Sequence, residues 1–206
     1  MIQIKNLFYN YDSKFSALYD VSFNLDTNTI ILADELSSKT LFRLISGQYK
    51  DYTGEIFVDN KNLKEIKLKN LSLCYITNPP YLLNKKSIEY NITYPLLVRK
   101  HDKTNTLTQA QELMTKHNLA NKKIKECTNF EKIITTLLRA VIRHPKIILI
   151  DDIFTNLNDN EFNLVLNIIN ELCSISLIII ALNNDKIINK FNDYKTIKLF
   201  NGSVEK

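Results

Sequence analysis

Short apolar runs that alternate with helical patterns constrain the fold of this chain more than any other feature. After Pro145 the pattern predicts three strands and two helices in alternation. The strands cover residues 147–150, 177–181 and 195–200, and the helices cover residues 160–173 and 185–191. Such alternation is typical of parallel βα units. We therefore expect an α/β fold with a parallel core sheet.

The first part of the chain is rich in strand patterns. We expect strands at residues 2–8, 18–25, 29–33, 52–59 and 71–76. The strand at 29–33 leads into a polar stretch at 34–38, which predicts a loop, and then into a helical pattern at 39–46. These patterns predict an N-terminal antiparallel β part and a strand–loop–helix unit.

A helical segment separates the β-rich start from the alternating end of the chain. Between about residues 78 and 142 we expect helices at 87–91, 107–117 and 131–142. No linker or internal repeat interrupts the sequence, and 206 residues are enough to bury a substantial core. We therefore expect residues 1–206 to form a single domain, with a helical subdomain at about 78–142.

Composition excludes several classes of protein. Hydrophobic residues make up 45% and charged residues 24% of the chain, so neither disorder nor a membrane span is indicated. The apolar run at 177–182 is too short to cross a bilayer, and residues 1–8 lack a signal-peptide pattern. We expect a cytosolic location. Cys74, Cys127 and Cys173 lie far apart without CxxC spacing, which favours core thiols over a zinc site or a disulfide framework.

Charge and glycine content limit the binding functions that we expect. The net charge of +5 comes from scattered lysines, with one short cluster at 121–125. We expect no nucleic-acid binding, since a solvated face or attraction to an anionic membrane surface explains such lysines equally well. The three glycines of the chain are Gly47, Gly54 and Gly202. A function that needs a glycine-rich loop is therefore disfavoured.

One segment has the context of a phosphate-binding loop. Residues 33–40 follow a predicted strand, precede a predicted helix and end in Lys39 and Thr40. Ala33 and Ser38 stand where such a loop has its two defining glycines. The strand–loop–helix context and the Lys–Thr ending are therefore present, but the glycines are not.

A second segment completes the pattern. Residues 139–152 give a helix end, a proline and a buried strand that ends in Asp151 and Asp152. In order and spacing, the two segments resemble the ATP-binding subunit of an ABC transporter, its nucleotide-binding domain, over essentially the whole chain. The resemblance implies a P-loop NTPase-like ABC ATPase fold and implies ATP and Mg²⁺ as ligands.

The resemblance also implies a role for individual positions. Nucleotide contacts are implied for an adenine-stacking aromatic and for four residues at the phosphates: Tyr11, Ser37, Ser38, Lys39 and Thr40. Magnesium contacts are implied for two residues: Thr40 and Asp151. The places of the catalytic glutamate, the switch histidine and the glutamine of the family are taken by Asp152, Asn183 and Thr77. The family signature corresponds to Thr128, Asn129, Phe130 and Glu131.

The predicted phosphate-binding loop departs from the family pattern in its charge. At about 4 Å and an effective dielectric constant near 20, contact between a phosphate and Asp34 or Glu35 would cost on the order of 4 kcal/mol. Lys39 at a helix N-terminus opposes the helix dipole unless an anion lies nearby. We hypothesise that Asp34 or Glu35 supplies this anion at the phosphate position. The alternative is an ordinary helix start that is capped by Ser37 or Ser38.

The other positions depart from the family as well. Asp152 is one methylene shorter than the family's glutamate, and misplacing a catalytic group by about 1 Å can cost on the order of 100-fold in rate. Asn183 forms hydrogen bonds but cannot carry the charge of a histidine, and Thr77 fits an ordinary strand end. In the signature segment, Thr128 and Glu131 favour a helix capping box over nucleotide contact.

We therefore expect an ATP-binding-type subunit of an ABC transporter complex with eroded catalytic motifs and impaired nucleotide binding. The resemblance implies two partners, a membrane permease and a second ABC-type ATPase subunit, and a peripheral position on the cytoplasmic face of the membrane. Two alternatives stay open. One is a slow ATPase that relies on Lys39, Thr40, Asp151 and Asp152, and the other is a cytosolic regulatory protein without a permease.

Overall fold

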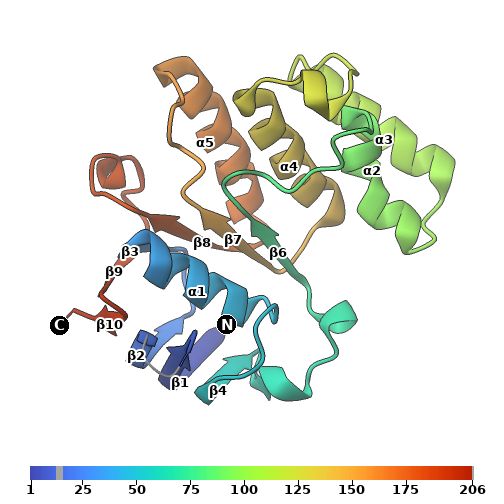
Figure 1. Ribbon diagram of the computed structural model, residues 1–206. Helices are drawn as coiled ribbons and strands as arrows, with labels where there is room; N and C mark the ends of the chain where they lie inside the picture. Colours follow the sequence, from blue (N-terminus) through green and yellow to red (C-terminus); the bar gives the residue numbers. More distant parts are fainter. Residues whose placement is uncertain (13–15, 206) are drawn as a thin grey trace. The chain divides into compact units, whose positions relative to one another are not determined.

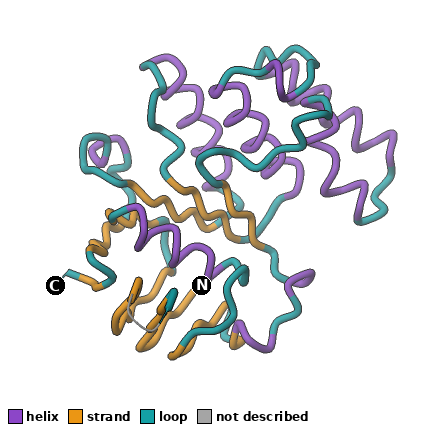
Figure 2. The backbone as a smooth tube through the Cα atoms, in the orientation of Figure 1, coloured by secondary structure: helices purple, strands orange, loops and turns teal. Residues whose placement is uncertain are grey.

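The computed structural model describes residues 1–12 and 16–205, and the chain divides into two compact units. Figure 1 labels the α-helices and most of the strands, and Figure 2 shows the succession of helices and strands along the backbone. The units are made of Met1–Tyr75, Lys146–Asp152 and Leu177–Lys206 in the first, and Ile76–Pro145 and Ile153–Ser176 in the second. The assignment of the whole chain to a single domain stays a prediction.

The first unit contains a four-stranded antiparallel sheet with the order β2-β1-β4-β5. Its strands are β1 (Ile2–Asn10), β2 (Ser16–Leu25), β4 (Thr53–Val58) and β5 (Lys61–Asn62). Strand β1 is central because it pairs with β2 on one side and with β4 on the other. The buried side chains Ile2, Ile4 and Leu7 of β1 belong to the core of this unit. The predicted antiparallel part is confirmed.

A second sheet has the order β10-β9-β3-β8-β7-β6 within the described residues. Its strands are β3 (Thr29–Ala33), β6 (Leu73–Ile76), β7 (Ile147–Asp151), β8 (Leu177–Leu182), β9 (Lys195–Phe200) and β10 (Ser203–Val204). Strand β3 pairs in parallel with β8 and β9, and β7 pairs in parallel with β8. All residues of β3 and β7 are buried, as is typical of apolar runs in a parallel sheet. The predicted parallel core sheet is confirmed.

Helix α1 (Glu35–Ile45) lies between the two sheets of the first unit (Figure 1). Its buried residues Leu41, Phe42, Leu44 and Ile45 join side chains from both sheets in one apolar core. Because β3 leads directly into α1, this packing fixes the position of the N-terminus of the helix at the carboxyl end of the parallel sheet.

The second unit contains four helices in its described residues. They are α2 (Ile88–Val98), α3 (Lys103–Lys116), α4 (Asn129–Arg143) and α5 (Asp159–Cys173). Helix α2 packs against α3 and α4, and α4 packs against α5. All four helices were predicted, but α2 is longer than expected because it continues through Pro95.

Two predictions of local structure are wrong. The expected helix at 185–191 is reduced to a short 3-10 turn, one of four such turns in the described residues: η1 (Leu63–Glu65), η2 (Leu68–Asn70), η3 (Ile124–Glu126) and η4 (Ile188–Lys190). The expected loop at 34–38 is also absent, because α1 begins at Glu35. The polar side chains of its first turn bond to each other and to backbone groups, which lets Ser37 and Ser38 be buried.

The three cysteines differ in burial. Cys74 and Cys127 are buried, as predicted for core thiols, whereas Cys173 is partly exposed.

In the ranges that the structure describes, no helix combines the length and the apolar character that crossing a membrane requires.

Candidate functional site

The predicted site residues are divided between the two units. Those in the first unit are Tyr11, Ser37, Ser38, Lys39, Thr40, Asp151, Asp152 and Asn183. Those in the second unit are Thr77, Thr128, Asn129, Phe130 and Glu131. The residues of the first unit lie at the N-terminus of α1, at the carboxyl ends of β7 and β8 and, for Tyr11, just after β1. The carboxyl edge of a parallel sheet is the usual place for a ligand in α/β proteins, so this group is the candidate site.

Asp34 alone separates β3 from α1. Its backbone is extended, with φ −66° and ψ 156°, and its carboxylate accepts hydrogen bonds from the Ser37 N–H (2.9 Å) and the Ser37 hydroxyl (2.7 Å). The Ser38 N–H donates to the Asp34 carbonyl at 3.0 Å, so helical bonding begins here. The predicted cap by Ser37 or Ser38 is therefore wrong. Asp34 is the N-cap because its carboxylate reaches an N–H group that has no partner within the helix.

The turn between β9 and β10 also donates to the start of α1. The Asn201 N–H donates to Asp34 Oδ2 at 2.9 Å, and the Gly202 N–H donates to Ser37 Oγ at 3.0 Å. Asn201 and Gly202 both have positive φ, 50° and 75°, as the Asn–Gly pair of a two-residue hairpin turn requires. The Asn–Gly dipeptide is a sequence signal for the turn. Nothing in the sequence indicates that the turn packs on α1.

The Asp34 carboxylate is held in its ionised form. Burial by itself would raise the pKa of this carboxyl, but the hydrogen bonds from Ser37 and Asn201 outweigh burial and lower the pKa below its ordinary value. At neutral pH, Asp34 therefore places a negative charge at the positive end of the α1 dipole.

Lys39 lies one turn into α1 and forms an ion pair with Glu35. The distance between Lys39 Nζ and Glu35 Oε1 is 2.5 Å, and the two side chains are 30% and 68% exposed. An exposed pair of this spacing contributes only about 0.3–0.5 kcal/mol to stability. The main effect of the pair is on position, because it holds the Lys39 ammonium group at the first turn of the helix, where Glu35 lies.

Tyr11 and Thr40 are brought together by a hydrogen bond. Their hydroxyl oxygens are 2.9 Å apart, and Thr40 is buried whereas Tyr11 is 41% exposed. The Tyr11 ring packs edge-on against Tyr9 and Tyr49, at centroid distances of 5.2 and 6.0 Å. The predicted adenine-stacking residue therefore contacts the predicted magnesium ligand and two aromatic rings of its own unit.

Asp151, at the end of β7, is a buried carboxyl with a perturbed pKa. Only 2% of the residue is exposed, and the Tyr75 hydroxyl donates to its Oδ2 at 3.1 Å. Burial raises the pKa to about 6, against the opposing effects of the Tyr75 bond and the charge of Lys39, with a smaller contribution in the same direction from Asp152. Tyr75 was not predicted, since no sequence signal connects it with a carboxylate 76 residues away.

Asp152 and Asn183 also lie together. The Asn183 amide donates to Asp152 Oδ2 at 2.7 Å, and the Asp152 N–H donates to the Ala181 carbonyl at 3.0 Å. Asp152 has φ 40°, a left-handed conformation that is uncommon for residues other than glycine, although Asp adopts it more readily than most. Two predicted catalytic positions, one after β7 and one after β8, are thus joined by a hydrogen bond.

The predicted residues of the second unit make local contacts. Thr77 Oγ1 donates to the Pro79 carbonyl at 2.8 Å. Thr128 and Glu131 form the predicted capping box at the start of α4, with bonds of 3.2 and 2.7 Å. Their neighbours Asn129 and Phe130 are the first two residues of the helix. The capping box is confirmed, while the other predicted roles in this unit stay predictions.

The described residues offer no ready-made metal centre. No group of three His, Cys, Asp or Glu side chains in them is placed to hold a metal ion. Magnesium usually binds one or two carboxylates together with phosphates and water. Asp151 could contribute one carboxylate, but only after it loses a proton from a group whose pKa is about 6.

Comparisons with known sequences identify relatives. A profile of the family described as ABC transporter matches residues 39–155, which include Lys39, Thr40, Asp151 and Asp152. A putative ABC transporter ATP-binding protein of Clostridium tetani is 23% identical over 99% of this chain and 48% of its own length. The methionine import ATP-binding protein MetN of Clostridium acetobutylicum is 30% identical over 88% of this chain and 61% of its own. This chain thus spans about half to three fifths of these curated relatives.

Solved structures show the same fold. The dimeric structure of MJ0796, a bacterial ABC transporter cassette, has a TM-score of 0.87 at 19% identity and covers 100% of this chain and 97% of that one. A dimeric post-hydrolysis state of the same cassette, bound to ADP and Pi, has a TM-score of 0.86. The predicted ABC ATPase fold is confirmed.

Replacing Asp34 with alanine tests the capping carboxylate. Asp34→Ala leaves three donors without their acceptor, so we expect the free energy of unfolding to fall by about 1–2 kcal/mol at pH 7 in urea denaturation. Asp102→Ala, which removes the exposed cap of α3 with its single bond from Asn105, is the matched control and should cost less. An equal or smaller loss for Asp34→Ala would contradict this role.

Replacing Asp151 with asparagine tests the buried carboxyl. The folded pKa, about 6, lies above the ordinary value of 3.8, so the folded state retains a proton that the unfolded state loses, and stability falls as pH rises from about 4 to about 6. Asp151→Asn avoids this penalty and should be more stable by about 2–3 kcal/mol at pH 7.5, with no gain near pH 4. Denaturation at several pH values measures the difference. A gain that is independent of pH, or one matched by the exposed control Asp193→Asn, would contradict the assignment.

Proposed function

Because this chain belongs to the ABC transporter family, we propose that it is an ATP-binding-type subunit whose own side chains occupy the place of the nucleotide phosphates. Nucleotide binding is then weak, and hydrolysis is slow or lost. The subunit contributes to a transporter complex mainly through its fold and its interfaces.

The capped start of α1 is the observation that carries this proposal. A helix N-terminus binds phosphate through N–H groups that have no other partner. In this chain the Ser37 N–H donates to the Asp34 carboxylate, and so does the Asn201 N–H from the neighbouring turn. From Ser38 onward the N–H groups belong to the helix. An approaching phosphate would displace a bound carboxylate rather than water.

The charge of this region opposes phosphate as well. The Lys39 ammonium is paired with Glu35. The ionised carboxylate of Asp34, the residue before Glu35, belongs to the same helix start. At about 4 Å and an effective dielectric constant near 20, each carboxylate would repel a phosphate charge by on the order of 4 kcal/mol, and less at the exposed Glu35. The chain's own anions therefore take the role that the nucleotide has in an active cassette.

The residues proposed for magnesium do not fit a bound MgATP in their present arrangement. The Thr40 hydroxyl is already bonded to Tyr11, and Asp151 is buried with a raised pKa. Binding the ion would require breaking the first contact and ionising the second group. Both requirements weaken magnesium binding, which supports the proposal.

The proposed catalytic pair also suits a weak enzyme. One carboxylate oxygen of Asp152 accepts a hydrogen bond from the Asn183 amide. A general base must be free to accept a proton, and its neighbour would have to stabilise developing charge, which a neutral amide does less well than a histidine. We therefore propose that Asp152 and Asn183 orient each other and contribute little to hydrolysis.

The partners follow from the family rather than from contacts of this chain. Relatives are named as ATP-binding proteins of import systems, and the MJ0796 cassette is dimeric. We propose that this subunit pairs with a second ABC-type ATPase subunit and attaches to a membrane permease from the cytoplasmic side. A partner with a complete phosphate-binding loop would then supply most of the ATP binding.

Neutralising the two acidic residues tests the proposal. In Glu35→Gln, and in the double variant with Asp34→Asn, the repulsion falls while the capping oxygen of residue 34 is retained. We expect affinity for a fluorescent ATP analogue in the presence of Mg²⁺ to rise by about 3–10-fold in Glu35→Gln and further in the double variant.

Glu171→Gln is the control for this experiment, because it removes an exposed carboxylate that pairs with Lys116 in the second unit. Its affinity should equal that of the natural chain. Unchanged or weaker binding in both acidic-site variants would reject the idea that these carboxylates block the phosphate position.

A further inference from the structure

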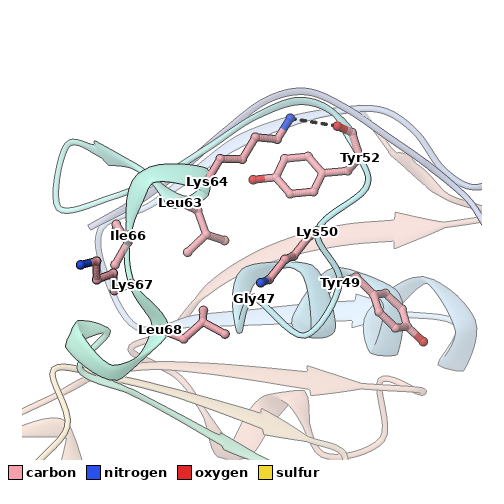
Figure 3. Close-up of a pocket in the computed structure, with 9 residues that line it drawn as sticks. All are labelled: Gly47, Tyr49, Lys50, Tyr52, Leu63, Lys64, Ile66, Lys67 and Leu68. Carbon is pink, nitrogen blue, oxygen red and sulfur yellow. Dashed lines mark hydrogen bonds between the residues drawn. The ribbon is translucent and has the colours of Figure 1, made fainter.

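A pocket in the first unit lies between the end of α1 and the segment that holds η1 and η2 (Figure 3). Its volume is about 230 Å³. The lining combines apolar side chains, two tyrosines and three lysines, and the described residues that line it include no acidic one. None of its lining residues belongs to the candidate nucleotide site.

The Tyr52 hydroxyl gives the pocket a polar group in need of a partner. Tyr52 is 9% exposed, and its hydroxyl has no hydrogen-bond partner among the described residues. A buried hydroxyl without a partner destabilises a fold, so its presence in a native structure calls for an explanation. Figure 3 shows the ring lying along the pocket wall with its hydroxyl directed to the side of Leu63. The hydroxyl itself is covered in the free protein, so a ligand oxygen in the pocket would accept its hydrogen bond after a small rotation of the Tyr52 ring or a small shift of Leu63.

Lys64 holds the Tyr52 side of the pocket in place. Its Nζ donates to the Tyr52 carbonyl at 3.0 Å and lies 4.3 Å from the centre of the Tyr52 ring. Its N–H donates to the Asn62 side chain, which caps η1. The opposite wall is equally constrained, because Tyr49 stacks on Tyr9 and accepts a hydrogen bond of 2.6 Å from Arg43. The pocket is therefore largely formed before any ligand binds.

Lys50 supplies a charge that these contacts leave available. Its side chain is exposed, and its ammonium group has no hydrogen bond or ion pair among the described residues. In Figure 3 it reaches toward the interior of the pocket, whereas the ammonium group of Lys67 points away from it. One ammonium and one hydroxyl match the single charge and the paired acceptor oxygens of a carboxylate.

Leucines form the apolar part of the pocket. Leu63 is buried, but Leu68 is 45% exposed although it lines the pocket. Gly47 allows Leu68 this position, since a Cβ at Gly47, where φ is 74°, would lie 2.3 Å from Leu68 Cδ2. A ligand with an apolar body would cover the exposed surface of Leu68.

We propose that this pocket binds a small organic carboxylate with an apolar body. Its carboxylate accepts hydrogen bonds from the Tyr52 hydroxyl and the Lys50 ammonium, and its body packs against Leu63 and Leu68. The proposal does not depend on whether the chain binds nucleotide, because no residue belongs to both groups, although the lining residue Tyr49 packs against Tyr11.

Calorimetric titration of the full chain with 3-phenylpropionate tests this proposal. A ligand of this size should bind with a dissociation constant of about 1 mM or tighter. The neutral amide of the same acid should bind at least about 5-fold more weakly, because it lacks the charge that Lys50 recognises. Absence of binding at about 10 mM, or equal affinity for the amide, would overturn the proposal.

Variants separate the pocket from general attraction to lysines. Tyr52→Phe removes only the hydroxyl and Lys50→Met removes only the charge, and each should weaken binding by about 5–10-fold. Because the hydroxyl has no partner in the free protein, Tyr52→Phe should leave the unfolding temperature unchanged or raise it. The control Lys69→Met removes an exposed lysine that does not line the pocket and should bind normally. Equal losses in all three variants, or full binding by Tyr52→Phe, would contradict the site.

Discussion

The contact between the Asp34 carboxylate and the start of α1 is the interaction on which the candidate site depends. The Asp34 carboxylate accepts hydrogen bonds from Ser37 within the helix and from Asn201 in the turn between β9 and β10. This carboxylate therefore connects the end of β3 with the first turn of α1 and with the β9–β10 turn at one side of the second sheet. A helix N-terminus requires such an acceptor, and in this chain a side chain provides it.

The predicted site residues around this carboxylate are bonded to other side chains of the chain. Lys39 is directed to Glu35, Thr40 to Tyr11, and Asp152 to Asn183. Each of these side chains thus has a partner from within the first unit. A ligand could enter only by exchanging several of these contacts, so the weak nucleotide binding that we propose would follow from the whole arrangement rather than from one substitution.

Much of the fold could be predicted because strands and buried apolar runs leave a clear period in the sequence. The strands β3 and β9 have the expected bounds, and β7 and β8 differ by one residue at an end. The start of α1 could not be predicted in the same way. Its first turn is polar, and the turn at Asn201 that helps to satisfy it is distant in sequence.

The candidate site could likewise be predicted only in part. The carboxylates at the end of β7 could be predicted from the buried strand that leads to them, since parallel strands end at one edge of the sheet. The Tyr75 contact to Asp151 and the Tyr11 contact to Thr40 depend on tertiary packing, for which the sequence carries no periodic signal. The pocket beside Tyr52 is likewise visible only when residues 47–52 and 63–68 are brought together.

Calorimetric titration of the natural chain with MgATP measures whether the capped start of α1 still accepts a triphosphate. With a carboxylate of its own at the phosphate position, the natural chain should bind MgATP with a dissociation constant of about 1 mM or weaker, which is a binding free energy of about 4 kcal/mol or less. Magnesium-dependent binding with a dissociation constant below about 10 μM would contradict it.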